Sequence, residues 1–329
     1  MSSLRPVSGS ADEIRELLVA WDAADAPEPL IIETSGSTGR PKRVALSRDA
    51  MRASALATHE RLGGPGHWEL NLPPTYVAGV QVLYRTIVAG PEADRRYISL
   101  VPTQLVRELR DDFGMRAQLA DYHAVLVGGG PLNPQIRAQA ESWYGIRIVQ
   151  TYGMSETCGG CVYDGFPLAG VEMKIDDGQV LLRGPMLFDG YDGDPERTAG
   201  ALRDGWFHTD DLGSIDADGR LHIEGRADDV IISGGVKVPA RAVATALTAD
   251  EAVVGVEVVG VPDAEWGERV VAVVAARDPL SLAALRDLVE PRSWAPRQLV
   301  VVPDLPALPN GKPDRMAMKE LAIAEWSRD

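Results

Sequence analysis

The sequence predicts an α/β fold, with a large N-terminal α/β domain that includes a small β-barrel-like subdomain, followed by a small α+β C-terminal domain. In the first half, continuous apolar runs of strand length alternate with helical stretches, which is typical of an α/β sheet. From Asp164, short alternating strands separated by glycines indicate the small antiparallel unit. After Asp228 longer apolar strands and helices return. We therefore expect an N-terminal domain over residues 1–227 and a C-terminal domain over 228–329.

Length and charge limit the classes of function. The chain has 329 residues, 45% of them hydrophobic, which is enough to bury a core and to form more than one domain. Its formal net charge of −15 argues against a nucleic-acid partner and against an anionic membrane. The N-terminus lacks a signal-peptide core, and no stretch reaches the ~20 apolar residues that span a bilayer, so we expect a cytoplasmic protein. The sequence leaves the oligomeric state open, and a homo-oligomer is compatible with it.

The only cysteines, Cys158 and Cys161, form one C-x-x-C pair in a glycine-rich stretch. A zinc site needs further Cys or His ligands at suitable spacing. A redox role is the alternative, but we expect reduced thiols without a metal.

The first elements predicted are a helix and two strands. Residues 11–24 place apolar side chains at positions i, i+3, i+4 and i+7, which predicts an amphipathic helix. Strands at 30–32 and 44–47 flank a glycine- and hydroxyl-rich loop, a hairpin-like arrangement. Ser47 is placed to cap a helix over residues 48–59.

The loop TSGSTGRPK between these strands has the composition of a phosphate cradle. Glycines expose backbone N–H groups, the hydroxyls add donors and the basic residues add positive charge. A Walker loop is excluded because Pro41, not glycine, precedes Lys42. A solvated turn is the alternative for this stretch taken alone. The cradle residues are Thr34, Ser35, Ser37, Thr38, Gly39 and Lys42.

Residues 75–89 predict a buried helix that Arg85 interrupts. A charge inside an apolar run is almost never left unpaired. Arg85 therefore either extends to solvent or binds an anion in a cavity, and the pattern leaves both open. Strands at 98–101, 124–127 and 146–149 follow, and the second ends in a glycine turn at Gly128, where open α/β sheets bind ligands.

Six segments in order resemble the core motifs of the adenylate-forming superfamily, which includes acyl- and aryl-CoA ligases. They are TSGSTGRPK, GGGPL, TYGMSET, GWFHTDDLG, GRADDVIISGGVKV and PNGKPDR, and they span Thr34 to Arg315. The cradle begins only 33 residues from the start of the chain. This short N-terminal part resembles actinobacterial o-succinylbenzoate-CoA ligases, as does the segment Leu72–Arg85.

The resemblance implies an AMP-forming acid-thiol ligase. Such enzymes activate a carboxylate with ATP, with Mg²⁺ bridging phosphate oxygens, and then exchange AMP for the thiol of coenzyme A. The implied small-molecule acid is o-succinylbenzoate, an intermediate of menaquinone biosynthesis.

The same resemblance implies roles for residues of the N-terminal domain. The cradle would hold the β- and γ-phosphates. Ser155 would reach the α-phosphate and Glu156 would hold Mg²⁺, a solvated loop acid being the alternative for Glu156. The adenine wall would be formed by Gly128, Gly129, Gly130 and Pro131, with Tyr152 stacking beside Gly153; a core tyrosine is the alternative for Tyr152.

The resemblance also implies roles for residues that follow the predicted α/β sheet in the sequence. Asp211 resembles the acid that binds the ribose hydroxyls, although Asp210 stands where glycine is usual, and Arg226 resembles a second ribose or phosphate contact. Asp228 matches the hinge of a mobile lid domain. Gly234 and Gly235 match the loop that lines the pantetheine tunnel, although Arg241 stands where the family usually has an acid.

Lys312 resembles the lysine that bridges the attacking carboxylate and the α-phosphate, and a flexible point charge suits that role. Without the resemblance, its Gly-Lys-Pro turn indicates a surface turn. For the acid, Arg85 is the candidate for the second carboxylate, and Tyr76 and Gly79 for the pocket wall.

Rival interpretations are an enzyme for another aryl or acyl acid, an adenylation enzyme that loads a carrier protein, and an inactive nucleotide-binding homologue. The joint presence of Lys312, Glu156 and Asp211 argues against the inactive homologue.

Overall fold

The structure is a computed structural model that describes residues 2–34, 42–110, 115–276, 278–308 and 313–326. Contacts divide the chain into two compact units. The first comprises Met1–Thr209 with Ile215–Leu221, and the second comprises Asp210–Ser214 with His222–Asp329. This division cuts through a single long strand. The predicted domain boundary at 227/228, with its hinge, stays a prediction.

The first unit contains a six-stranded sheet in the order β10-β9-β8-β7-β6-β5. Strands β5 to β8 run parallel to one another, and β9 and β10 extend the sheet antiparallel. Their bounds are β5 Gly66–Glu69, β6 Arg95–Leu100, β7 Ala124–Val127, β8 Ile148–Met154, β9 Gly159–Tyr163 and β10 Phe166–Pro167.

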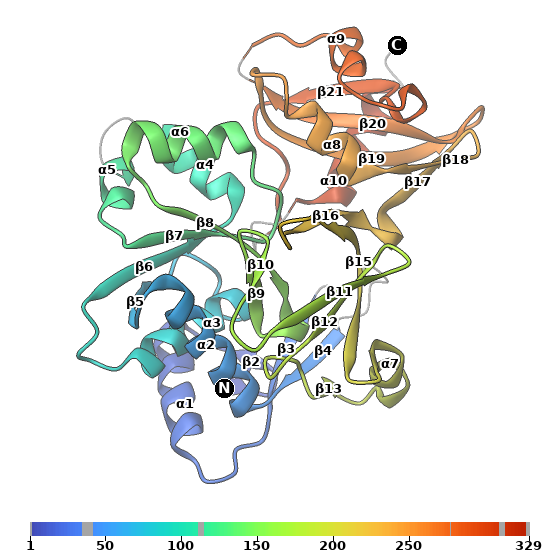
Figure 1. Cartoon of the computed structure of the whole chain (residues 1–329). Helices are drawn as coiled ribbons and strands as arrows, with labels where there is room; N and C mark the ends of the chain where they lie inside the picture. Colours follow the sequence, from blue (N-terminus) through green and yellow to red (C-terminus); the bar gives the residue numbers. More distant parts are fainter. Residues whose placement is uncertain (1, 35–41, 111–114, 277, 309–312, 327–329) are drawn as a thin grey trace. The chain divides into compact units, whose positions relative to one another are not determined.

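Helices cover both faces of this sheet (Figure 1). One face packs against α4 (Pro102–Arg110), α5 (Met115–Ala120) and α6 (Pro134–Tyr144). The other packs against α2 (Arg48–Leu62) and α3 (Val77–Ala89), with α1 (Ala11–Ala23) outside them. Because both faces are covered, the central strands are continuous apolar runs. This confirms the predicted α/β class.

The predicted hairpin is present as β3 (Leu30–Thr34) and β4 (Lys42–Leu46), which pair antiparallel. Strand β13 (Gly190–Tyr191) pairs with the other edge of β4. Ser47 caps α2 as predicted, since its side chain accepts a hydrogen bond from the Ala50 N–H. Near the N-terminus, β1 (Ser3–Leu4) and β2 (Val7–Ser8) form a separate two-stranded sheet.

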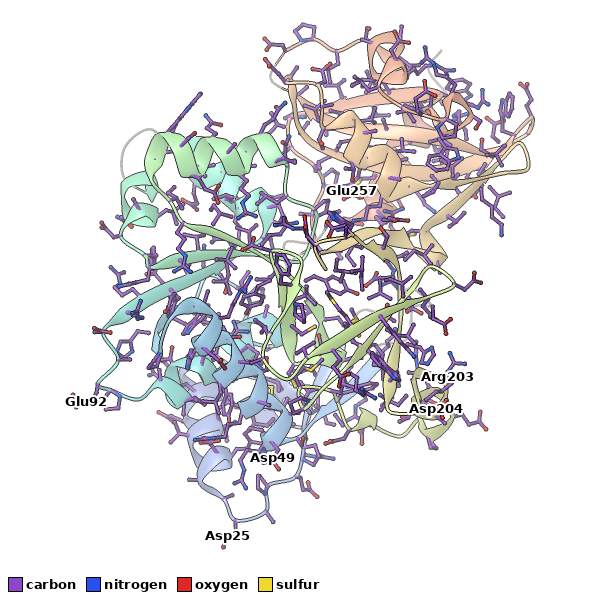
Figure 2. All side chains as sticks on the ribbon, in the orientation of Figure 1. Asp25, Asp49, Glu92, Arg203, Asp204 and Glu257 are labelled. Carbon is purple, nitrogen blue, oxygen red and sulfur yellow. The ribbon has the colours of Figure 1, made fainter. Side chains whose placement is uncertain are left out.

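The predicted short-strand region forms a five-stranded sheet. Two of its pairs, β11–β12 and β14–β15, are antiparallel. Its elements are β11 Glu172–Asp176, β12 Gln179–Arg183, β14 Leu202–Arg203, β15 Trp206–Ile215 and β16 Leu221–Arg226, with α7 (Pro195–Ala201) before β14. The exposed acids Asp25, Glu92 and Asp204 lie on loops of the first unit (Figure 2), a placement that suits an acidic chain.

The second unit is an α+β domain around a five-stranded sheet, ordered β18-β17-β20-β19 with β21 also on β20. The strands are β17 Val230–Ser233, β18 Val236–Pro239, β19 Val253–Asp263, β20 Gly267–Ala276 and β21 Gln298–Val302; the helices are α8 Ala240–Leu247, α9 Leu282–Asp287 and α10 Arg315–Trp326.

Alternate residues of β20 pack on opposite faces of that sheet. Val270, Ala272 and Val274 join the core beneath α8 and α9. Val271 and Val273 join the core beneath α10. The run is apolar at successive positions because helices cover both of its faces.

Among the described residues, no helix has the length and apolarity needed to cross a membrane.

Candidate active site

Two glycines predicted for nucleotide binding lie where there is no room for a side chain. Strands β7 and β8 are parallel neighbours, so the residues after them meet at one edge of the sheet. A Cβ on Gly128 would overlap the Thr151 hydroxyl, and one on Gly153 would overlap the Gly159 carbonyl oxygen. This edge therefore brings together Gly128, Gly129, Gly130, Pro131, Tyr152 and Gly153.

Strand β8 changes partner at this edge. It pairs in parallel with β7 up to Gln150, then antiparallel with β9 from Thr151, with an irregularity between Tyr152 and Gly153. The sequence predicted the strand only to residue 149 and did not predict β9. Strand β9 begins with two glycines, which have no side chains and therefore give no alternating apolar pattern.

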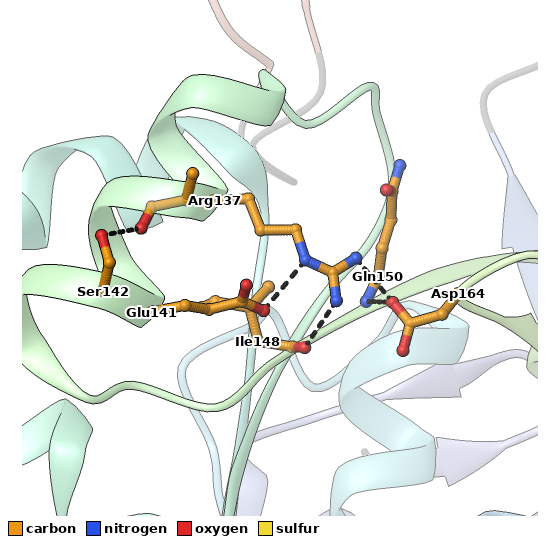
Figure 3. A network of polar contacts seen from close by, with 7 residues as sticks. Arg137, Glu141, Ser142, Ile148, Gln150 and Asp164 are labelled. Atoms are coloured by element: carbon orange, nitrogen blue, oxygen red, sulfur yellow. Dashed lines mark hydrogen bonds and ion pairs between the residues drawn. The ribbon is translucent and has the colours of Figure 1, made fainter.

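An arginine network supports β8 just before the change of partner (Figure 3). Arg137 on α6 donates to Asp164 Oδ1 at 2.7 Å, to the Ile148 carbonyl at 3.2 Å and to Glu141 Oε1 at 3.0 Å. Asp164 Oδ1 also accepts from the Gln150 N–H at 3.1 Å. These bonds join α6 to β8 and to the turn that follows β9.

A short 3₁₀ turn, η1 (Ser155–Thr157), follows β8 and carries two of the predicted catalytic side chains, those of Ser155 and Glu156. The Thr157 hydroxyl has a single proton, which can be donated to the Gly159 carbonyl at 2.7 Å or to the Met154 carbonyl at 3.1 Å, and its oxygen accepts from the Met154 N–H; these bonds hold the turn in shape. Ser155 is 7% exposed and Glu156 is 6% exposed. Glu156 is therefore a buried acid, and the alternative of a solvated loop acid is wrong.

Tyr191 links Glu156 to the hairpin of the predicted cradle. Its hydroxyl donates to Glu156 Oε1 at 2.9 Å. In β13 it lies opposite Val44 of β4, and Lys42 Nζ lies 5.9 Å from the centroid of its ring. Thr34 and Lys42 face each other across the hairpin. The predicted metal ligand thus lies beside the strands that carry the cradle.

Sequence reasoning missed Tyr191. The only local signal was a Gly-Tyr pair in a glycine- and acid-rich stretch, which resembles a loop. Its contact with Glu156 joins residues 35 positions apart, and no helical or strand period reports such a contact.

Several predicted residues lie outside the described part of the chain. These are Ser35, Ser37, Thr38 and Gly39 of the cradle, and Lys312. For Asp228 the backbone is described, within the 3₁₀ turn η2 (Ala227–Asp229).

The predicted acid-binding residues lie at and within α3. Tyr76 is the N-cap residue, and a Cβ on Gly79 would overlap the Pro73 carbonyl oxygen, so the proline turn lies directly on the first turn of the helix. Arg85 is only 4% exposed, and its Cζ lies 4.8 Å from the centroid of the Trp68 ring. Its Nε has no hydrogen-bond partner among the described residues. Of the two interpretations left open, extension to solvent is therefore wrong.

In the second unit, Arg226 contacts both adjacent acids of β15. Its Nη2 lies 3.2 Å from Asp210 Oδ2, and its Nη1 lies 3.9 Å from Asp211 Oδ1. Asp211 is 7% exposed, whereas the Asp210 side chain is largely exposed. The unusual Asp210 continues the strand and supplies a second carboxylate to Arg226.

Gly234 and Gly235 form the tight turn between β17 and β18, with φ values of 58° and 79°. A two-residue hairpin turn with positive φ at both positions favours glycine. The Gly234 N–H donates to the Trp266 carbonyl at 2.8 Å, and a Cβ on Gly234 would lie 2.7 Å from the indole ring. Trp266 therefore packs directly on this turn.

The second unit also contains a chain of ion pairs. Arg315 lies 3.3 Å from Glu257 and 3.6 Å from Asp229. Burial raises the pKa of Glu257, while the charges of Arg315 and Arg241 oppose that rise. Arg241, where an acid was usual, thus lies close enough to act on a buried carboxylate.

Cys158 and Cys161 are buried free thiols. Burial raises the pKa of both, so neither is a thiolate at neutral pH.

Within the described residues there is no cluster of three or more His, Cys, Asp or Glu side chains that could hold a metal by itself. A hard carboxylate ligand suits Mg²⁺, which commonly takes one or two carboxylates and completes its shell with phosphate oxygens and water. Glu156 fits this pattern as a buried carboxylate beside the cradle hairpin.

The fold and the candidate site define an adenylate-forming enzyme. The features that do so are a parallel sheet with a glycine-lined edge, a 3₁₀ turn that carries a buried acid beside the cradle hairpin, and a separate α+β unit. Two family models match the chain: "AMP-binding enzyme" over residues 70–192 and "AMP-binding enzyme C-terminal domain" over 242–312. A probable 2-succinylbenzoate--CoA ligase of Mycobacterium tuberculosis is 42% identical over 321 residues, covering 88% of this chain and 83% of that protein. The chain belongs to the AMP-binding enzyme family, and within it to the 2-succinylbenzoate--CoA ligases.

Two solved structures have a similar fold. The amide bond synthetase McbA of Marinactinospora thermotolerans matches with a TM-score of 0.75 and 30% identity, over 88% of this chain and 68% of that one. The o-succinylbenzoate CoA synthetase MenE of Bacillus subtilis, in complex with its acyl-adenylate intermediate, matches with a TM-score of 0.73 and 26% identity over the same shares.

Proposed function

We propose that this protein is an ATP-dependent acid-thiol ligase that adenylates o-succinylbenzoate and transfers the acyl group to coenzyme A. The observation that carries the proposal is the buried Glu156–Tyr191 contact beside the cradle hairpin, in a chain 42% identical to a probable 2-succinylbenzoate--CoA ligase. The motif order supports the reaction type, and the relatives support the acid.

The first step joins two anions. A carboxylate oxygen attacks the α-phosphorus of ATP, the bond to the β-phosphate oxygen breaks, and pyrophosphate leaves. The protein must lower the repulsion and hold the groups in line. We assign phosphate binding to the cradle residues, from Thr34 to Lys42, and α-phosphate contact to Ser155. Lys312 would bridge the carboxylate and the α-phosphate.

Mg²⁺, when bound, neutralises charge on the phosphate oxygens. We assign its protein ligand to Glu156. The Tyr191 hydroxyl, which donates to Oε1, orients that carboxylate.

The nucleoside would lie at the glycine-lined edge of the sheet, with Tyr152 against adenine and Asp211 and Arg226 at the ribose. In the second step the thiol of coenzyme A attacks the acyl carbon and AMP leaves. We propose that the lid turns at Asp228 between the steps, and that Gly234 and Gly235 then line the pantetheine path.

We assign recognition of the aromatic carboxylate to Arg85. A buried guanidinium is costly unless it meets an opposite charge, and an anionic ligand offsets that cost. Tyr76 and Gly79 would form the pocket wall. Only the aliphatic carboxylate of the diacid then remains free to react. A cytoplasmic location stays a prediction.

The test is ATP–pyrophosphate exchange driven by a panel of carboxylic acids and repeated as a full reaction with coenzyme A. The proposal expects exchange with o-succinylbenzoate and saturable coenzyme A dependence. Exchange without coenzyme A turnover would indicate a carrier-protein-loading enzyme. An absence of exchange with every acid would indicate an inactive homologue.

A further inference from the structure

Unpartnered buried polar atoms concentrate in one part of the first unit. Among the described residues, five buried side-chain nitrogen or oxygen atoms lack a hydrogen-bond partner, and four of them come from α2, β5 and α3. Native interiors leave few such atoms, and each needs an explanation. The four are His59 Nε2, Trp68 Nε1, Gln81 Oε1 and Arg85 Nε.

These side chains come from elements that pack on one another. Helix α3 contacts both α2 and β5. Gln81 and Arg85 are four residues apart on α3 and so share a face. Gln81 Nε2 lies 3.4 Å from Met51 Sδ of α2, and the Arg85 guanidinium lies over the Trp68 ring of β5. The polar atoms thus line the packing of α3 against its two neighbours.

His59 of α2 is the neighbour whose chemistry complements Arg85. It is 4% exposed, as is Arg85. Burial, together with the charge of Arg85, lowers the pKa of His59 to about 4, so the imidazole is neutral at neutral pH. A neutral imidazole has one acceptor nitrogen, whereas a guanidinium has only donors. A neutral His59 therefore retains an acceptor for a guanidinium donor and does not repel its charge.

Two neighbours then restrict the guanidinium. The indole of Trp68 covers one face of the guanidinium, and the buried imidazole of His59 lies within electrostatic range of its charge. A carboxylate bound by an arginine gains most when the planar donor group is held in a fixed orientation.

We propose that His59 is a positioning residue that orients the Arg85 guanidinium toward the second carboxylate of a dicarboxylic acid substrate. The residue thereby sets the preference for a diacid over a monoacid. This inference rests on the proposed function.

The experiment compares two acids that share the reacting carboxylate. One is o-succinylbenzoate, and the other is 4-oxo-4-phenylbutanoate, which lacks the aromatic carboxylate. Pyrophosphate release is measured for wild type, Arg85→Ala, His59→Leu and His59→Gln. The control is Thr58→Val, which deletes a neighbouring buried polar group of α2 that bonds the Tyr163 hydroxyl at 3.0 Å.

Arg85→Ala is expected to raise KM for the diacid about tenfold or more, because one tenfold step corresponds to only ~1.4 kcal/mol. His59→Leu is expected to raise that KM about fivefold, with kcat and the monoacid kinetics unchanged. His59→Gln, which restores an acceptor, is expected to recover most of the loss. Thr58→Val is expected to leave the preference between the two acids unchanged.

The inference is overturned if His59→Leu leaves the diacid KM unchanged or affects both acids equally, since the second result would mean a structural role only. If His59→Leu does not fold, His59→Met carries the same comparison. A wild-type protein that releases no pyrophosphate with o-succinylbenzoate would instead refute the proposed function.

Discussion

At the scale of single residues, the candidate site depends on side chains that no motif identified. The Tyr191 hydroxyl donates to Glu156, and the charge of Arg85 acts on the buried His59; both pairs join separate elements. The sequence singled out Glu156 because it lies in a motif, and Arg85 because it is a charge within an apolar run. It could not say what packs on them, because a 3.6-residue period reports which face of a helix is buried and not which side chain lies opposite.

Replacing Tyr191 with Phe removes the only hydroxyl that donates to Glu156 among the described residues. A hydrogen bond to a charged group contributes about 1.5–3 kcal/mol. We expect adenylation to slow by about tenfold or more and to need more Mg²⁺, as measured by pyrophosphate exchange against Mg²⁺ concentration. Tyr163→Phe, which removes another buried tyrosine hydroxyl, is the control. An unchanged Mg²⁺ dependence in Tyr191→Phe would contradict the role of this contact.

His59 makes stability depend on pH. Its pKa of about 4 lies below the ordinary 6.5, so between these values the unfolded chain binds a proton that the native state does not. Stability is then complete above pH 6.5 and falls on acidification through this window. We expect the free energy of unfolding to drop by about 1–2 kcal/mol more between pH 7 and pH 5 in wild type than in His59→Gln. Urea unfolding at both pH values measures this difference, and equal drops would contradict it.

At the scale of elements, local chemistry predicted some features and tertiary contacts determined others. The Ser47 cap, the β3–β4 hairpin and the apolar strands β6 and β7 were predictable because caps, glycine loops and buried runs are local signals. Strand β9 was not, because two of its residues are glycines and its pairing follows from the change of partner in β8. Tertiary pairing there overrides intrinsic strand propensity.

Gly153→Ala tests that junction. The added methyl group would overlap the Gly159 carbonyl, and a backbone atom cannot move aside as a flexible side chain would. We expect a loss of about 2–4 kcal/mol in unfolding free energy, measured in urea, together with loss of pyrophosphate exchange. Gly200→Ala in α7 is the matched control, since a methyl group added there would meet no atom within 4 Å, and we expect it to be neutral or slightly stabilising. Equal effects of the two substitutions would show that close approach is not what requires Gly153.

At the scale of the whole molecule, the pattern of apolar runs and glycines along the sequence predicted an α/β part followed by an α+β part. Both parts are present. The division by contacts falls within β15, upstream of the predicted boundary at 227/228. The composition and strand pattern of the sequence change where the glycine-rich strands end. Compact units, in contrast, are defined by the contacts between residues. A strand long enough to serve both units, such as β15, gives no compositional signal where they divide.

Lys312→Ala tests whether the two half-reactions use different states of the C-terminal domain. We expect adenylate formation to be lost, since the bridging charge is absent, while thioester formation from preformed acyl-adenylate is largely retained. The two steps are measured separately, by pyrophosphate exchange and by coenzyme A consumption. Equal loss of both would refute an exchange of domain states.

Under the proposed function, in which Arg226 contacts the nucleotide, its ion pairs with Asp210 and Asp211 have a consequence for nucleotide affinity. An arginine carries several rotatable bonds, and ordering it on binding subtracts from affinity. Two carboxylates on one strand restrict that freedom during folding, before any nucleotide arrives. An enzyme with glycine in place of Asp210 would keep only the contact with Asp211, so a larger part of the entropic cost of ordering its arginine would be subtracted from its nucleotide affinity.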